Sequence, residues 1–177
     1  MTKSEMPLSF ARSLAVNVIE RLKPFCKRIE IAGSIRRQKP IIGDIEIVLI
    51  PKTDQQGLFE SDSVRDSGFI KTVKGLGARI KGNAEQGKYI QILLDWEQIK
   101  VDLFIANENN FGLIHMLRTG SWQFSKRMVT ICKKAGYYVK NGYLWDIITG
   151  EMIPIPEESE FFRLLGIYEP PPEKREI

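Results

Sequence analysis

The first regular pattern in the chain is helical. Apolar residues recur at every fourth position, at Phe10, Leu14, Val18 and Leu22. This spacing places them on one stripe of a helix, which packs against a core while the remaining surface stays polar. Pro24 interrupts the backbone hydrogen bonding that a helix interior needs. The pattern therefore predicts an amphipathic helix that begins near Ser9 and ends before Pro24.

The spacing of apolar residues then changes to a period of two, which is typical of strands. The segments KRIEIAG, residues 27–33, and GDIEIVLIP, residues 43–51, both alternate isoleucine with other residues. The segment KYIQILLDWEQIKVDLFIA, residues 88–106, predicts two strands joined by a turn near 95–98. Residues 52–82 are polar and predict a loop, then a short helix at 67–75. This order of elements predicts a mixed sheet with helices on one face.

The remainder of the chain predicts helices and one hairpin. NFGLIHMLRTG predicts a helix capped by Asn110 and ended by Gly120, and WQFSKRMVTICKKAG predicts a second helix that stops at Gly136. Asn141 and Gly142 separate two strand-like runs, which is a strong hairpin signal.

A last helix and a tail complete the pattern. PEESEFFRLLG predicts the helix, and the proline-rich segment YEPPPEKREI predicts a loose C-terminal tail. We expect two lobes, at residues 1–108 and 109–177, with the loose tail at the end of the second.

Composition narrows the possible chemistry. The chain is 43% hydrophobic and 27% charged, which is typical of a soluble, globular protein, and its net charge of +4 permits a polyanionic partner without requiring one. His115 is the only histidine, and Cys26 and Cys132 are far apart with apolar neighbours. We expect two reduced, packed thiols and a packed histidine. A zinc cluster or a serine–histidine–aspartate triad is excluded, so an enzyme would rely on carboxylates, arginines and a hard metal ion.

The chain also carries no obvious targeting signal. The N-terminal segment MTKSEMPLSF lacks the apolar stretch of a signal peptide, and no apolar run approaches membrane-spanning length. We therefore expect a cytoplasmic protein, either nucleoid-associated or in the cytoplasm of a virus-infected host, with no membrane partner.

Three acids in the predicted strands suggest a metal site. Side chains alternate faces along a strand, so Asp44 and Glu46 share the face opposite Ile45 and Ile47, roughly 7 Å apart. If the later strand pairs with this one, Asp102 joins them. Carboxylates in close quarters repel unless cations lie between them, and Mg²⁺ prefers such oxygen ligands. The alternative for each acid alone is an ordinary solvated strand face.

A second motif, GSIRR, precedes the first two acids. Gly33 allows a close approach of backbone to a ligand, and Ser34 offers a hydroxyl. Arg36 and Arg37 supply donors suited to phosphate. A tight turn with a solvated basic surface is the alternative for this pentapeptide alone. Together with the acids, it favours a site where metal ions meet a triphosphate.

These motifs resemble those of the family X DNA polymerases, within the DNA polymerase beta-like nucleotidyltransferase superfamily. The matching elements are GS-x-RR, GD-x-E, the later VDLF, and LRTGS at residues 117–121. The resemblance implies an α+β fold: a nucleotidyltransferase palm, with a mixed sheet and helices on one face, plus a small nucleotide-binding lobe of helices and a β-hairpin. It also implies a minimal form that lacks the lyase and helix-hairpin-helix domains of larger members.

The resemblance implies a role for individual residues. Asp44, Glu46 and Asp102 would be the catalytic, metal-binding acids, with two Mg²⁺ ions that Mn²⁺ could replace. Lys100 would hold the third acid in place. The nucleotide-binding set would comprise Gly33, Ser34, Arg37, Gly43, Gly120, Ser121 and Trp122. Trp122 would stack on the incoming base, the alternative being a packed aromatic.

The sequence departs from the family pattern at two places. Glu46 stands where aspartate is usual, and Leu117 and Arg118 stand where many members carry aromatics that exclude ribonucleotides. The choice of sugar therefore stays open. Basic residues that would grip DNA, or would simply be solvated, are Lys71, Lys74, Arg79, Lys81 and Lys88, and Lys126, Arg127, Lys133 and Lys134.

We therefore expect a monomeric DNA-directed DNA polymerase that transfers a nucleotide to a primer 3′-hydroxyl in a gapped duplex or primer-template. Short-gap filling in DNA repair is the favoured role. The alternatives are a template-independent transferase acting on RNA, protein or a small molecule, and a non-catalytic nucleic-acid-binding module.

Overall fold

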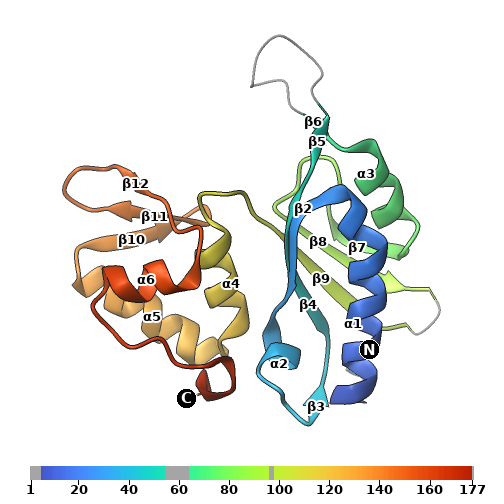
Figure 1. Ribbon diagram of the computed structural model, residues 1–177, viewed down its shortest axis with the longest axis horizontal. Helices are drawn as coiled ribbons and strands as arrows, with labels where there is room; N and C mark the ends of the chain where they lie inside the picture. Colours follow the sequence, from blue (N-terminus) through green and yellow to red (C-terminus); the bar gives the residue numbers. More distant parts are fainter. Residues whose placement is uncertain (1–4, 55–63, 96–97, 177) are drawn as a thin grey trace.

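The computed structural model describes residues 5–54, 64–95 and 98–176. Two lobes lie side by side and are joined by the segment that leaves the large sheet (Figure 1). The expected turn at 95–98 and the expected loop after 52 lie partly outside the described residues. The division into domains at residue 108 stays a prediction.

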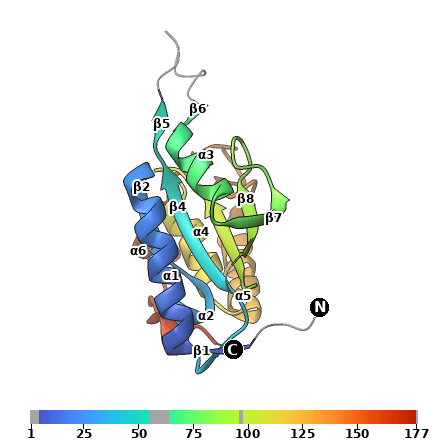
Figure 2. The same ribbon diagram turned by 90° about the vertical axis from the view of Figure 1, so that its right-hand side faces the viewer.

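The first lobe contains a five-stranded mixed sheet. Its strands, in spatial order, are β2 Cys26–Ile31, β4 Ile45–Pro51, β9 Lys100–Ile105, β8 Tyr89–Leu94 and β7 Gly77–Gly82. The pair β4 and β9 is parallel, and the other pairs are antiparallel. Helices α1 (Leu8–Leu22) and α3 (Ser67–Lys74) cover one face of this sheet (Figures 1 and 2). The prediction of a mixed sheet with helices on one face is confirmed.

The period-two pattern of β4 explains the two faces of the sheet. Ile45, Ile47 and Leu49 are fully buried in the core that α1 and α3 complete. Val48 and Ile50 point the other way, into a separate apolar cluster that includes Phe111 of the second lobe. The face that carries Glu46 is therefore turned toward the second lobe.

One long strand was not anticipated. β7 lies at the edge of the sheet, within a region predicted to be only loop and helix. Its sequence, GARIKG, carries charge and is bounded by glycines, and most of its residues are exposed. Charged residues are common on edge strands because they discourage pairing with other chains, and they also hide the strand from a pattern search.

Several short strands also escaped prediction. β1 (Met6–Pro7) pairs with β3 (Ile41–Ile42), and β5 (Thr53–Asp54) pairs with β6 (Val64–Arg65). Two-residue ladders are too short to produce an apolar period. The short helix α2, Gly33–Arg36, follows β2 as the GSIRR motif predicts.

The second lobe packs three helices against a small antiparallel sheet. Its elements are α4 Phe111–Thr119, α5 Trp122–Lys134, β10 Tyr137–Lys140, β11 Tyr143–Asp146, β12 Met152–Ile153 and α6 Glu158–Leu164. Asn141 and Gly142 both have positive φ, as a two-residue hairpin turn requires. The predicted hairpin is confirmed, although β12 adds a third strand to it.

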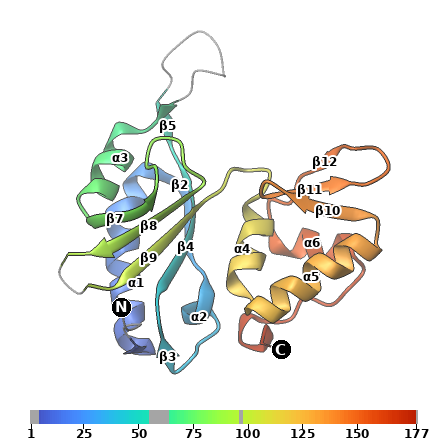
Figure 3. The same cartoon turned by 180° about the vertical axis from the view of Figure 1, so that it is seen from behind.

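Helix α4 is the element of the second lobe nearest the large sheet (Figure 3). Asn110 precedes this helix, but its side chain does not cap it. Asn110 instead accepts a hydrogen bond from the backbone N–H of Asn107 at 2.8 Å and donates one to the carbonyl of Gly142 at 3.1 Å. The predicted cap is therefore wrong, because the side chain ties the inter-lobe segment to the hairpin.

The C-terminal tail is not loose. A short 3₁₀ helix, η3 (Pro172–Lys174), leads into Arg175, whose side chain is 1% exposed. Both terminal nitrogens of Arg175 donate to the carboxylate of Glu158, each at 3.1 Å. Burying a guanidinium requires such a partner, so the tail is fixed by an ion pair that its proline-rich composition concealed.

Candidate active site

The structure places two of the three predicted acids directly opposite each other. In the parallel pair of β4 and β9, Glu46 is in register with Asp102, on the sheet face turned away from α1. Asp44 lies just before β4. The predicted pairing of the two acid-bearing strands is therefore confirmed.

Electrostatics show that the three acids influence one another. The pKa of Glu46 rises from 4.5 to about 7, chiefly because the side chain is buried and also because Asp44 and Asp102 carry negative charge nearby. Arg118 and Arg37 oppose this rise only in part. Glu46 is thus an acid whose ionisation is unfavourable until a positive charge arrives.

The donor set suits a hard cation, but the geometry is incomplete. Carboxylate oxygens are the ligands that Mg²⁺ prefers. Across the part of the chain that the structure describes, no group of three histidine, cysteine, aspartate or glutamate side chains is arranged to hold one metal ion. That Asp44, Glu46 and Asp102 share one coordination sphere therefore stays a prediction.

The glycine of the GSIRR turn lies against one of these acids. Gly33 has φ +61°, and a Cβ atom at this position would overlap the Glu46 carboxylate. The backbone N–H of Ala32 also donates to the carbonyl of Glu46 at 2.8 Å. Glycine is therefore required here both by its backbone conformation and by the side chain beside it. The predicted anion-binding turn and the predicted acid are immediate neighbours.

The predicted triphosphate ligand Arg37 is already engaged. It donates to the carbonyl of Thr119 at 2.6 Å and to the carboxylate of Glu176 in the tail. Lys39 also lies 3.3 Å from the Glu176 carboxylate. The Glu176 carboxylate in the tail thus already accepts a hydrogen bond from Arg37, the arginine expected to bind phosphate. The roles of Ser34, Gly43 and Arg37 stay predictions.

Asp102 is held by residues that the motifs did not reveal. Its Oδ1 accepts hydrogen bonds from the hydroxyl of Tyr89 and from Nε2 of Gln91, both at 2.8 Å. Lys100, expected to hold this acid, is not among its partners in the described residues. The contact between Gln91 and Asp102 follows from strand pairing, since the two residues are in register across β8 and β9.

The predicted sugar-binding residues have structural partners of their own. The hydroxyl of Ser121 accepts a hydrogen bond from the backbone N–H of Phe124 at 3.2 Å and thereby caps the N-terminus of α5. Gly120 packs so closely on Phe124 that a Cβ would overlap its ring. Contacts of Gly120 and Ser121 with a sugar stay predictions.

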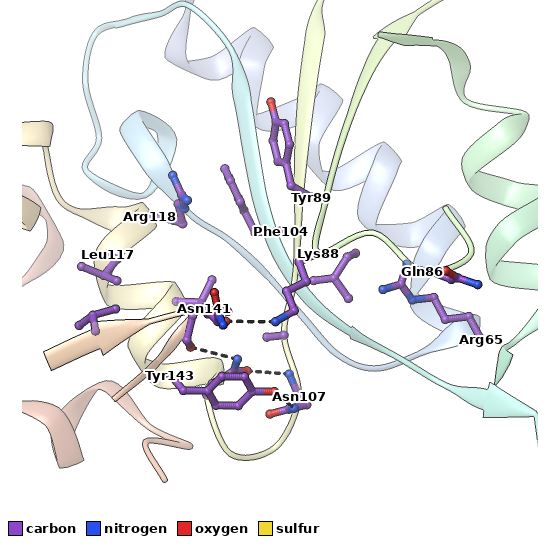
Figure 4. A pocket seen from close by; sticks show the side chains of 16 residues that line it. Arg65, Gln86, Lys88, Tyr89, Phe104, Asn107, Leu117, Arg118, Asn141 and Tyr143 are labelled. Carbon is purple, nitrogen blue, oxygen red and sulfur yellow. Dashed lines mark hydrogen bonds between the residues drawn. The ribbon is translucent and has the colours of Figure 1, made fainter. Parts of the chain in front are cut away.

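A cavity of about 510 Å³ lies between the lobes, and Tyr89, the hydrogen-bond partner of Asp102, is in its wall. Its walls include Tyr89, Phe104 and Arg118, which lie side by side, with Lys88 and Tyr143 farther along (Figure 4). The amine of Lys88 donates to the carbonyl of Asn141 at 3.2 Å, which links the lobes across this cavity.

Trp122 lies outside this cavity. Its side chain is 71% exposed and lines a separate groove of about 600 Å³ on α5 with Lys126, Arg127 and Lys134. The amine of Lys126 is 4.9 Å from the centre of the Trp122 ring. Stacking of Trp122 on an incoming base stays a prediction.

Sequence comparisons show which proteins this chain is similar to. Residues 115–176 match the family described as DNA polymerase beta thumb. DNA polymerase lambda of Rattus norvegicus is 28% identical over 162 residues, covering 80% of this chain and 28% of that protein. The DNA polymerase/3'-5' exonuclease PolX of Bacillus subtilis is 26% identical over 179 residues, covering 96% of this chain and 28% of that protein. The chain is therefore similar to polymerases of this type, at 28% identity or less.

A viral family X relative matches this chain over most of both lengths. The Repair DNA polymerase X of African swine fever virus is 25% identical over 158 residues, covering 87% of this chain and 84% of that protein. By contrast, the chain spans about a quarter of the rat and Bacillus polymerases. The similarity to these polymerases covers both lobes, because the matches extend well beyond residues 115–176.

Other predictions about side chains are also resolved. Cys26 and Cys132 are buried free thiols, and burial raises the pKa of each to about 12. His115 is buried, with its Nε2 3.0 Å from the carbonyl of Ile31. Both expectations of packed residues are confirmed. Among the described helices of this chain, none is long and apolar enough to cross a membrane.

Proposed function

We propose that this chain catalyses nucleotidyl transfer from a nucleoside triphosphate to the 3′-hydroxyl of a DNA primer, most suitably in a short gap during repair. The observation that carries this proposal is the placement of Glu46 opposite Asp102, with the Gly33 turn packed on Glu46. An acid pair next to an anion-binding turn suits phosphoryl chemistry. The relation to polymerases supplies the substrate class.

The three acids would act as a metal-binding set. When bound, two Mg²⁺ ions, or Mn²⁺ in their place, would supply positive charge to the attacking and leaving oxygens. Asp44, Glu46 and Asp102 would hold them. Asp102 lies on the central strand β9, and its carboxylate would accept the proton of the primer 3′-hydroxyl. The raised pKa of Glu46 supports a cation-binding role, because a cation would compensate both for the burial of this carboxylate and for its repulsion by Asp44 and Asp102.

The triphosphate would be bound by the turn beside β4. Ser34 and Arg37 would contact its oxygens, while Gly33 and Gly43 would allow close approach of the backbone. Arg37 now binds the Glu176 carboxylate, and a triphosphate would have to displace it. A phosphate oxygen would then take the position beside the Arg37 guanidinium that the Glu176 carboxylate holds.

The nucleoside would occupy the cavity between the lobes. Its volume of about 510 Å³ is sufficient for a nucleoside. Gly120 and Ser121 would border the sugar. Arg118 occupies the cavity wall where an aromatic is usual in the family, so discrimination against ribonucleotides would be weak.

The DNA would lie along the basic face of α5. Trp122 offers a stacking surface, and Lys126, Arg127, Lys133 and Lys134 are charged neighbours on the same helix. Neutralising phosphates in this way makes binding depend strongly on salt.

A one-nucleotide-gapped duplex provides the test. Extension would be measured with each dNTP and NTP, with Mg²⁺ or Mn²⁺, for the wild type and for Asp44→Ala and Asp102→Ala. Both variants should lose incorporation while keeping their unfolding temperature. Glu20→Ala, on the exposed surface of α1, is the matched control and should extend normally. A full rate in either aspartate variant would refute the assignment of metal ligands.

The same assay separates the polymerase from a template-independent transferase. A polymerase should insert the complementary nucleotide in the gap and leave single strands unextended. Extension of single-stranded DNA or RNA at a comparable rate would favour the transferase.

A second candidate is a DNA-binding module without catalysis. The observation in its favour is that the described acids do not form a complete metal-binding group, while α5 still exposes Trp122. A binder of this kind should retain DNA without any rise in unfolding temperature from Mg²⁺ and dNTP together. Such a rise would exclude it.

A further inference from the structure

Within the described part of the chain, hydrogen bonds hold only one of the two carboxylate oxygens of Asp102. Both hydrogen bonds that Asp102 accepts, from Tyr89 and Gln91, reach the same oxygen, Oδ1. Among the described residues, Oδ2 accepts no hydrogen bond. Two donors on one oxygen restrict rotation of the carboxylate about its Cβ–Cγ bond. The other oxygen remains available to a ligand.

Tyr89 is itself held by a stack of side chains. Its ring lies 5.3 Å from that of Phe104, with 28° between the planes, and the guanidinium of Arg118 lies 4.1 Å above the Phe104 ring (Figure 4). Such a cation–π contact favours one orientation of the aromatic beneath it. The stack therefore connects α4 of the second lobe, through β9 and β8, to the hydroxyl that contacts Asp102.

Both donors to Asp102 carry a proton at physiological pH, because a tyrosine hydroxyl ordinarily ionises only at about pH 10. Gln91 cannot lose its donor, since an amide does not titrate.

We propose that Tyr89 and Gln91 are positioning residues that orient Asp102, so that its Oδ2 is presented to the metal ion and the primer 3′-hydroxyl. Phe104 and Arg118 support Tyr89 in this role. The inference rests on the proposed nucleotidyl transfer. It assigns to β8 the part that the sequence motif had suggested for Lys100.

A purely structural role would look different. If the two hydrogen bonds only satisfy a partly buried carboxylate, their loss should lower stability without changing metal affinity or turnover. If they orient Asp102, their loss should weaken metal binding and slow turnover, while the dNTP, bound mainly through its phosphates and sugar, keeps its KM. Loss of groups that orient a metal ligand typically costs 10–100-fold in metal affinity or activity.

The variants are Tyr89→Phe, Gln91→Met and the double substitution in the full chain. Mn²⁺ binding by isothermal titration calorimetry gives a readout independent of activity. Single-turnover insertion in a gapped duplex gives the rate constant and KM separately. Tyr138→Phe is the matched control, because Tyr138 stacks on Trp145 in the second lobe.

The double variant should bind Mn²⁺ roughly 10–100-fold more weakly and insert dNTP more slowly by a similar factor. Its KM for dNTP should stay within about twofold, while Tyr138→Phe resembles the wild type in every respect. Unchanged Mn²⁺ affinity and rate in the double variant, with an active wild type, would overturn only this inference. A wild type that neither binds Mn²⁺ nor extends primers would overturn the proposed function and this inference with it.

Discussion

Replacing Glu46 with glutamine should stabilise the metal-free protein. In the folded chain, the pKa of Glu46 rises from 4.5 to about 7, first through burial and then through the charges of Asp44 and Asp102. Glutamine has nearly the same shape and no charge. The substitution therefore removes a negative charge that is unfavourable in the folded state, where Glu46 is buried near two other acids, but not in the unfolded state.

The magnitude follows from linkage between protonation and folding. Below pH 4.5 the carboxyl is protonated in both states, so Glu46 and glutamine should give similar stability. Between pH 4.5 and about 7 the unfolded chain releases its proton first, so the wild type loses stability as the pH rises. Above pH 7 the loss is complete and amounts to at most about 3 kcal/mol, since partial solvent exposure screens the charges.

Chemical denaturation with a metal chelator present would measure this effect. The difference in unfolding free energy between Glu46→Gln and the wild type should grow from pH 4.5 to pH 7 and then stay constant. It corresponds to a rise of roughly 6–12 °C in unfolding temperature at pH 8. Glu20→Gln, an exposed change on α1, should show no such trend.

Magnesium provides the complementary half of the experiment. Because a cation relieves the repulsion among the acids, Mg²⁺ should stabilise the wild type at pH 8 and have little effect on Glu46→Gln. The variant should also lose incorporation activity. Equal or lower stability of Glu46→Gln at pH 8 in chelator would refute the reasoning that burial and the neighbouring acids make ionised Glu46 unfavourable in the folded state.

Three further outcomes are expected. Arg175→Met breaks a buried ion pair with Glu158 and should lower the free energy of unfolding by about 3 kcal/mol in urea denaturation; a loss below about 1 kcal/mol would contradict the structural role of the tail. Glu176→Gln should release Arg37 and lower the KM for dNTP several-fold without changing the maximal rate, whereas an unchanged KM would separate the tail from the phosphate site. Replacing the four basic residues of α5 with glutamine should weaken DNA binding at 50 mM salt far more than at 500 mM, and an equal effect at both salts would argue against phosphate contacts.

The parts of the fold that could be predicted from sequence depend on neighbours along the chain. The alternation of Ile45, Glu46 and Ile47 gave both faces of β4 because strand geometry is local. Asn141 and Gly142 revealed the hairpin because their turn needs positive φ at both positions. β7 was hidden because an exposed, charged edge strand has no apolar period.

The missing parts of the candidate site depend on contacts between distant segments. The hydrogen bonds to Asp102 come from β8 and need the register of two strands, which a motif does not contain. The pairing of Arg175 with Glu158 joins the tail to α6, and proline content gave no sign of it. Lys100 was favoured by likeness to a family motif, and the contacts of Asp102 instead follow from strand register.

The assignment of successive β4 side chains to two different cores also constrains how this chain can change in length. Deleting or inserting one residue between Gly43 and Leu49 would rotate every later side chain of the strand to the opposite face. Leu49 would then leave the core beneath α1, and a change before Glu46 would turn that carboxylate into the same apolar core. A library of single-residue insertions and deletions should therefore show near-complete loss of folded protein in this strand, while point substitutions at its surface-facing positions survive.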